Sequence, residues 1–137
     1  MKHYSCTDLA GVPDFRAAEY SDKSADYCLL IPVINEGARI LTELGRARKA
    51  GIDRLCDIVV CDGGSTDGSM SNDILPTYGV NTLLVKTGPG KQGAQLRMGL
   101  YFALQRGYKG VLTIDGNNKD SIEDVPEFIE KLQQGYD

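Results

Sequence analysis

Residues 57–69 read Asp57-Ile58-Val59-Val60-Cys61-Asp62-Gly63-Gly64-Ser65-Thr66-Asp67-Gly68-Ser69 and change abruptly from apolar residues to acids, glycines and hydroxyls. The run from Ile58 to Cys61 has no polar alternation, which predicts a strand covered on both faces, as in a parallel sheet. This strand delivers Asp62 to a loop in which Gly63 and Gly64 allow a sharp turn and a close approach to a ligand. Ser65, Thr66 and Asp67 are N-cap residues, so we expect the next helix to begin there. Nucleotide sites of open α/β sheets have this arrangement, although Asp-Gly-Gly-Ser alone also fits a simple turn.

The composition is that of one soluble globular domain. The chain has 137 residues, of which 42% are hydrophobic and 25% charged, enough for a single core but too few for a second complete domain. No apolar run approaches the ~20 residues of a transmembrane helix, and the N-terminus lacks the apolar core of a signal peptide, so we predict a cytoplasmic protein. The formal charge is −4 and the basic residues are scattered, which argues against nucleic acid as a partner.

The cysteines and the single histidine do not form the pattern of a metal site or of a catalytic triad. Cys6, Cys28, Cys56 and Cys61 form no Cys-x-x-Cys pair, and His3 alone could add a nitrogen ligand. Buried free thiols are therefore favoured over a zinc site or a disulfide framework. One histidine near the N-terminus also disfavours Ser-His-Asp and Cys-His catalysis.

Strand and helix patterns alternate four times after the first 26 residues. Residues 1–26 mix glycine, proline and charge without a period, so we predict a surface arm with one helical turn near residues 15–20. The predicted strands are residues 27–34, 57–62, 80–86 and 109–115. The predicted helices run from a cap at Asn35 to Gly51, through residues 70–78, through residues 94–104, and from a capping box at Ser121 to Gly135. This alternation predicts an α/β fold, a Rossmann-like open parallel sheet with helices on both faces and strand order 3-2-1-4.

With that strand order, a ligand crevice opens above the first strand, between its two neighbours. Pro32 is expected near the end of the first strand, because it lacks one ladder donor. Asn35-Glu36, Asp62 and Asp115 then sit at the carboxyl ends of three adjacent strands. Three unrelated turns would not be expected to direct acids at one crevice, so together they indicate a site.

A glycine loop, Gly88-Pro89-Gly90-Lys91-Gln92-Gly93, precedes the third predicted helix. It is not the phosphate loop of nucleoside triphosphatases, because the first glycine of that motif is missing and Gln92 stands where Ser or Thr is required. Lys91 and Arg97 are candidates for contacts to a phosphate or a base. Taken singly, a solvated helix charge is the simpler interpretation of either residue.

Four segments, spread over residues 27–137, resemble the family 2 glycosyltransferases of GT-A fold, which include polyprenyl- and dolichol-phosphate sugar transferases. The segments are Ile31-Pro32-Val33-Ile34-Asn35-Glu36, Val60-Cys61-Asp62-Gly63-Gly64-Ser65-Thr66-Asp67-Gly68-Ser69, Gly90-Lys91-Gln92-Gly93-Ala94 with Arg97 and Gly99, and Ile114-Asp115-Gly116-Asn117. The chain departs from the family pattern at Ile34, where an aromatic residue is common, and at Gly63 and Asn117, where the family often has a second acid.

The resemblance implies an inverting enzyme that transfers a sugar from a UDP- or GDP-sugar to an acceptor hydroxyl or a lipid phosphate, such as a membrane polyprenyl phosphate. Residues 27–137 would be its nucleotide-sugar-binding domain, truncated before the acceptor half, with the general base beyond Asp137 and membrane association through missing parts. The implied nucleotide site comprises Pro32, Asn35, Glu36, Asp62, Gly63, Lys91 and Arg97. Asp115 and Asn117 would hold the diphosphate through Mg²⁺ or Mn²⁺, with Lys119 a candidate for part of the charge that Asn117 lacks.

Two other functions stay open. A nicotinamide oxidoreductase would need Gly-x-Gly-x-x-Gly after the first strand, where Ile34-Asn35-Glu36-Gly37 offers one glycine. A nucleotide-binding module without turnover has the same fold, and no residue up to Asp137 can be assigned as the general base.

The fourth predicted strand is an apolar edge, Val111-Leu112-Thr113-Ile114, without proline or inward charge. Exposed edges of this kind invite pairing. We therefore expect the isolated chain to form a homodimer through this edge or to aggregate. We also expect it to bind donor nucleotide weakly and to transfer no sugar.

Overall fold

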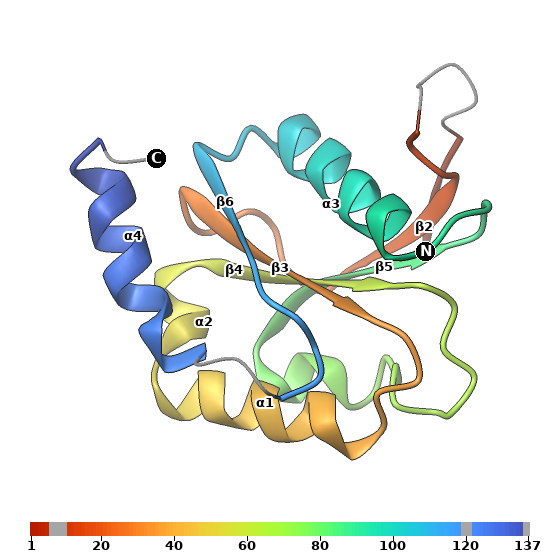
Figure 1. Ribbon diagram of the computed structural model, residues 1–137, viewed down its shortest axis with the longest axis horizontal. Coiled ribbons are helices and arrows are strands. Elements are labelled where there is room, and N and C mark those ends of the chain that lie inside the picture. Colours follow the sequence, from red (N-terminus) through yellow and green to blue (C-terminus); the bar gives the residue numbers. More distant parts are fainter. Residues whose placement is uncertain (6–10, 119–121, 136–137) are drawn as a thin grey trace.

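The computed structural model describes residues 1–5, 11–118 and 122–135, which form a six-stranded mixed sheet with helices on both faces (Figure 1). The sheet order is β1-β2-β5-β4-β3-β6. Four neighbouring strands, the last of them at an edge, run parallel in the predicted order 3-2-1-4, so the Rossmann-like α/β prediction is confirmed, with two antiparallel strands added. The strands are β1 (Lys2–Tyr4), β2 (Phe15–Glu19), β3 (Tyr27–Val33), β4 (Asp57–Asp62), β5 (Val80–Lys86) and β6 (Gly110–Thr113).

The two middle strands, β3 and β4, form the centre of the core. They pair in parallel from Cys28↔Asp57 to Val33↔Asp62, and every residue of β4 is buried. Alternate β3 side chains enter different clusters: Leu29, Ile31 and Val33 on one face, Cys28 and Leu30 on the other. Burial on both faces explains the unbroken apolar runs from which both strands were predicted.

The first 26 residues do not form the predicted surface arm. β2 pairs antiparallel with β5, from Phe15↔Lys86 to Glu19↔Thr82, and β1 pairs with β2. The predicted helical turn near residues 15–20 is therefore wrong. Phe15 is buried and stacks on the Tyr4 ring at 4.6 Å between centroids, which ties the sheet extension to the core. Cys6 lies outside the described residues.

Helices cover the two faces of the sheet unequally. α3 (Gln92–Arg106) packs on one face, where Met98, Phe102 and Ala103 contact the cluster that contains Cys28 and Leu30. Gly99 permits this approach, because a Cβ there would lie 2.7 Å from the Cys61 sulfur. The opposite face carries α1 (Ala38–Lys49), α2 (Ile52–Leu55), the 3-10 helices η1 (Leu75–Tyr78) and η2 (Ile122–Asp124), and α4 (Val125–Gln133) (Figure 1).

Two helix predictions are wrong at their N-terminal ends. The predicted cap at Asn35 does not exist, because α1 begins at Ala38 after Gly37, and Asn35 adopts a left-handed φ of 48°. Residues 63–74, all of them described, follow an irregular path, so no helix opens at residues 65–67. The predicted helix through residues 70–78 shrinks to the short η1, with Pro76 in its first turn. The predicted cap at Ser121 falls outside the described residues.

Among the described strands, β6 lies at the edge of the sheet, with β3 as its neighbour. Thr113 is exposed there, and Val111 and Leu112 are partly buried.

Among the described helices, none is both long and apolar enough to cross a bilayer.

Candidate functional site

A cleft of about 470 Å³ opens at the carboxyl ends of the central strands. Parallel strands end at one edge of their sheet, so the loops after β3, β4 and β6 meet there, beside the start of α3. The cleft brings together six of the residues predicted for the site: Pro32, Glu36, Gly63, Lys91, Asp115 and Asn117. Asn35, Asp62 and Arg97 do not line it. Its remaining wall is formed by Val33, Ile34, Gly90, Gln92 and Gln95.

Asp62 lies beneath the cleft and holds the loop that follows β4. Its side chain is 2% exposed. The Oδ1 atom accepts hydrogen bonds from the Ser65 backbone N–H at 3.0 Å and from the Ser65 hydroxyl at 2.6 Å. These bonds form the turn that Asp-Gly-Gly-Ser suggested, and the turn places Gly63 in the cleft wall. The carboxylate therefore organises the site from below.

Asn35 connects the loop after β3 to the loop after β4. Its backbone N–H donates to the Ser65 hydroxyl at 2.9 Å, and its Oδ1 accepts from the Thr66 N–H at 2.8 Å. A further bond runs from the Gly37 N–H to the Asp67 Oδ2 at 3.0 Å. Hydrogen bonds from Ser69, assisted by the one from Gly37, lower the pKa of Asp67, which keeps it an acceptor. The two loops thus form one unit along the cleft.

Gln95 is a site residue that the sequence analysis missed. It is 4% exposed and lines the cleft from α3. Its Nε2 donates to the Val33 carbonyl at 2.7 Å and to the Cys61 carbonyl at 2.9 Å, so it bridges the ends of β3 and β4. One signal could have found it: Gln95 falls on the apolar stripe of α3 with Met98 and Phe102, where a polar side chain is unusual.

Asp115 and Asn117 line the cleft from the loop after β6. Between them, Gly116 packs directly on β3: a Cβ there would lie 2.4 Å from Val33 Cγ1, and its N–H donates to the Pro32 carbonyl at 3.3 Å. The Gln92 amide donates to Asp115 Oδ1 at 2.6 Å across the cleft. Gly116 thereby fixes the backbone between the two candidate metal ligands.

The candidate metal ligands are one carboxylate and one amide oxygen. Among the described residues, no group of three or more His, Cys, Asp or Glu side chains could hold an ion. Asp115 and Asn117 fit a divalent ion that takes its other oxygen ligands from a diphosphate and from water. Lys119 lies outside the described residues.

The thiols of the described cysteines do not line the cleft. Cys28, Cys56 and Cys61 are buried free thiols, as predicted. Burial raises the pKa of Cys28 and of Cys56 to about 12, and raises that of Cys61 as well. These thiols therefore stay protonated and unreactive at neutral pH.

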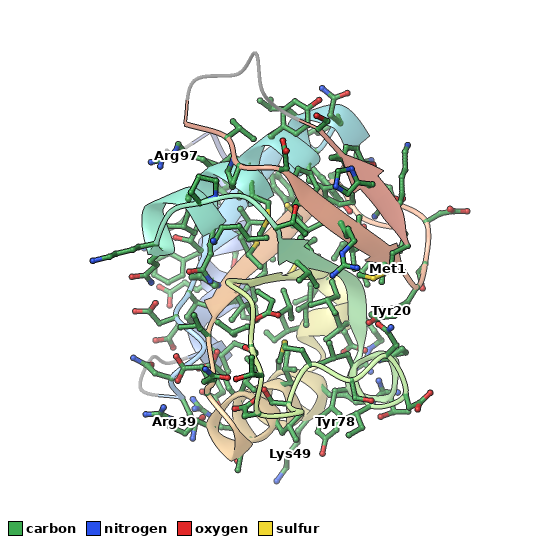
Figure 2. All side chains as sticks on the ribbon, turned by 90° about the vertical axis from the view of Figure 1, so that its right-hand side faces the viewer. Met1, Tyr20, Arg39, Lys49, Tyr78 and Arg97 are labelled. Carbon is green, nitrogen blue, oxygen red and sulfur yellow. The ribbon has the colours of Figure 1, made fainter. Side chains whose placement is uncertain are left out.

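Arg97 lies away from the cleft, at the surface of α3 (Figure 2). Its Nε donates to the Gly11 carbonyl of the segment before β2. Lys91, by contrast, lies at the start of α3 and lines the cleft. The structure therefore brings one of the two predicted cations to the site.

No family model matches the chain. The chain is 31% identical over 110 residues to glycosyltransferase AglJ of Haloferax volcanii, a match that covers 80% of this chain and 33% of that protein. It is 29% identical over 124 residues to the undecaprenyl-phosphate 4-deoxy-4-formamido-L-arabinose transferase of Aeromonas hydrophila subsp. hydrophila, covering 80% of this chain and 34% of the relative. The chain is similar to glycosyltransferases.

The structural comparison agrees with this similarity. The crystal structure of S. aureus TarS matches with a TM-score of 0.51 and 26% identity, over 78% of this chain and 20% of TarS. The resemblance to glycosyltransferases that the motifs indicated is thus confirmed. The chain spans about a third of the length of the two curated relatives.

The cleft is braced from α1. Glu43, 0% exposed, accepts the Asn118 backbone N–H at 3.0 Å, and Arg46 donates to the Asn118 side chain at 2.6 Å. Arg46 also forms a two-point contact with Glu123, from Nε at 2.8 Å and from the NH2 group at 2.5 Å. Asn118 adopts a left-handed φ of 61° directly after Asn117. These contacts hold the turn that follows the candidate metal ligands.

Glu123→Gln is expected to lower thermal stability at neutral pH and to have a much smaller effect near pH 2. The hydrogen bond from Arg46 lowers the pKa of Glu123 from 4.5 to about 2. A depressed carboxyl pKa contributes stability that is full above the unfolded pKa and is lost as the pH falls through the folded one. The stability that Glu123 contributes should therefore disappear as the pH is lowered from about 4.5 to about 2.

Melting temperatures of the parent and the Glu123→Gln variant between pH 7 and pH 2 test this prediction. Glu127→Gln is the matched control, because Glu127 is 68% exposed and its i,i+4 pair with Lys131 is long, at 3.7 Å. The control should track the parent. If the difference in melting temperature between the parent and Glu123→Gln stays constant down to pH 2, the prediction is contradicted.

Proposed function

We propose that the chain is the nucleotide-sugar-binding part of a metal-assisted, inverting family 2 glycosyltransferase that uses a UDP- or GDP-sugar. One observation carries this proposal: a single cleft joins strand-end residues such as Glu36 and Gly63 to Asp115, Asn117 and Lys91. The similarity to glycosyltransferases over 80% of the chain supports it.

In this proposal the two ends of the ligand meet different chemistry. The diphosphate lies beside Lys91, Asp115 and Asn117, because a cation and hard oxygen ligands suit phosphate and a divalent metal. Mg²⁺ or Mn²⁺, when bound, would neutralise the charge that builds on the leaving diphosphate. The nucleoside lies over the ends of β3 and β4, near Pro32 and Gly63. The loop unit tied by Asn35 fixes this wall before the ligand arrives.

The acceptor in this proposal is a lipid phosphate such as a polyprenyl phosphate. The Aeromonas relative carries undecaprenyl phosphate in its name. The protein would then act from the cytoplasm at a membrane surface. The general base would come from outside the cleft residues described above.

Calorimetric titration with UDP, GDP, CDP and ADP, each with Mn²⁺ and with a chelator, tests the nucleotide site. UDP or GDP should bind at least about tenfold more tightly than ADP, which corresponds to one well-placed hydrogen bond to the base. Mn²⁺ should tighten that binding, and the chelator should weaken it. If none of the four nucleotides binds, or all four bind alike, the proposed function is wrong.

We also propose that the chain forms a homodimer through the open edge of β6. The Ile114 N–H donates to the Leu30 carbonyl of β3 at 3.1 Å. Backbone N–H groups alternate sides along a strand, so the Thr113 N–H points away from β3 and is available to a second copy. Thr113→Pro removes that donor without breaking a bond to β3, as proline on an edge strand does.

Thr113→Pro is therefore expected to shift the chain from dimer towards monomer. Light scattering at several protein concentrations measures the effect, which should be at least about a tenfold rise in the dimer dissociation constant. The matched control is Thr113→Val, which changes the same side chain but keeps the backbone N–H. This control should dimerise like the parent. A parent that is monomeric at all concentrations would rule out the edge as an interface.

A further inference from the structure

Gln95 has an orientation that the protein alone fixes. Its amide carries two hydrogens on Nε2, and both are donated to main-chain carbonyls, those of Val33 and Cys61. Two acceptors at 2.7 and 2.9 Å require the NH₂ group on that side, so the Oε1 atom must face the other way. Within the described part of the chain, no hydrogen bond to Oε1 is found, and Gln95 lines the cleft. A fixed acceptor is thus directed into the cleft.

Gly63 keeps this acceptor uncovered. A Cβ at position 63 would lie 2.9 Å from the Gln95 Cδ and 3.0 Å from Oε1. Gly63 does not have a left-handed φ, so the space beside Gln95, rather than the backbone, requires glycine there. The Gly63 N–H also donates to the Val33 carbonyl at 2.9 Å, which fixes the same corner. Position 63 therefore has room only for glycine, because a Cβ there would collide with the Gln95 amide.

A carbonyl oxygen held in one orientation, on a residue that is only 4% exposed, selects among ligand groups by chemistry. It stabilises an N–H or O–H donor, and it disfavours a phosphate oxygen or a methyl group, which would leave it desolvated without a partner. The cation Lys91 lies about one turn before Gln95, at the start of the same helix, and the candidate oxygen ligands Asp115 and Asn117 come from the loop after β6. Oε1 should accordingly face the uncharged nucleoside, with the diphosphate placed at those other residues.

We propose that Gln95 is a specificity-determining residue, whose Oε1 accepts a hydrogen bond from a nucleoside donor, either a ring N–H of the base or a ribose hydroxyl. This inference rests on the proposed function. It adds that a nucleotide lacking the donor is rejected at this position. Gly63 acts with Gln95, because it leaves the acceptor open.

Calorimetric titrations with modified nucleotides test the proposal and separate the two sources of the donor. The probes are UDP, 3-methyl-UDP, which lacks the ring N–H, and 2′-deoxy-UDP and 3′-deoxy-UDP, which lack a hydroxyl. If GDP is the tighter ligand, 1-methyl-GDP and the deoxy-GDPs replace them. The parent should lose at least about tenfold in affinity with one of the analogues, since an unpaired buried acceptor is costly.

Variants assign that loss to Gln95. In Gln95→Met, which keeps the length of the side chain but has no amide, the discrimination should fall to about twofold or less. Gln92→Met is the matched control, because Gln92 lies on the same helix and lines the same cleft but donates to Asp115. It should discriminate like the parent. Gly63→Ala places a methyl group against the Gln95 amide, 2.9 Å from Cδ and 3.0 Å from Oε1, and should also reduce discrimination. This variant covers the case in which Gln95→Met does not fold.

Four results would overturn the proposal. The first is a parent that binds UDP and every analogue within about twofold, and the second is a Gln95→Met variant that still discriminates. If Gln95→Met does not fold, a Gly63→Ala variant that discriminates like the parent has the same meaning. A parent that binds neither UDP nor GDP overturns the proposed function itself, and the role of Gln95 falls with it.

Discussion

Asp62→Ala is expected to weaken binding of UDP or GDP by at least about tenfold. The carboxylate accepts two hydrogen bonds at Oδ1 from Ser65, at 3.0 and 2.6 Å, and both are lost in the variant. Hydrogen bonds to a charged group contribute roughly 1.5–3 kcal/mol each. Without them the loop after β4 no longer holds Gly63 in the cleft wall, nor Ser65 and Thr66 against Asn35. The ligand must then order the loop itself, which lowers its affinity.

Two further variants separate this effect from loss of charge. Ser65→Ala removes the hydroxyl bonds and keeps the backbone bond, so affinity should fall by only about threefold. Asp67→Ala removes an acid from the same loop, but its partners are Ser69 and Gly37, outside the cleft wall. The Asp67→Ala variant should therefore bind UDP or GDP more tightly than the Asp62→Ala variant does. Melting temperatures show whether each variant remains folded during titration. If Asp62→Ala binds as well as the parent, the central site is wrong.

The buried parallel strands could be predicted because their pattern is complete within a few residues. Ile58 to Cys61 in β4 form an apolar run that only a strand covered on both faces explains, and Val80–Lys86 was predicted to its last residue. The strand β2 could not be recognised in this way. Its alternation is short, and its partner β5 lies about 70 positions away, with Phe15 opposite Lys86. The pairing, which no local pattern reveals, makes it a strand.

The loop after β4 misled the prediction for a related reason. Met70, Ile74 and Tyr78 have helical spacing, and Ser65 to Asp67 are common caps. The hydroxyl and carboxyl groups instead bond to each other and to the neighbouring loop, as in the contact between Asp67 and Gly37. Side chains of these types compete with helix formation by binding nearby backbone groups. Tertiary contacts decided which set of bonds formed.

The cleft was largely predictable where its residues follow a strand, and not where they lie on a helix. Glu36, Gly63 and Asp115 line it because parallel strands end together. Arg97 does not, because six residues of α-helix correspond to about 240° beyond one full turn from Lys91. Gln95 was missed because its role depends on two carbonyls that lie 62 and 34 positions away in the sequence. A polar helix residue is usually exposed, and only the fold shows otherwise.

Asp115→Ala is expected to make nucleotide binding indifferent to Mn²⁺. Asp115 supplies the carboxylate among the two candidate ligands, and its Oδ1 already accepts the Gln92 amide at 2.6 Å across the cleft. Titrations of UDP and GDP with Mn²⁺ and with a chelator should then give the same affinity, whereas the parent should differ by about tenfold. A parent that is itself indifferent to chelator would count against a metal here.

Asn117→Asp is expected to have the opposite effect and to tighten Mn²⁺ binding about tenfold in the presence of UDP or GDP, because a second carboxylate adds charge to the ligand set. Without metal, two carboxylates on either side of Gly116 repel each other, so the melting temperature of the free protein should fall. With metal and nucleotide it should rise above that of the parent. Asn72→Asp is the control, because it adds the same charge in an exposed loop beside Tyr20. It should change neither the Mn²⁺ affinity nor the melting temperature. Equal metal affinities in the parent and Asn117→Asp would show that position 117 is not a ligand.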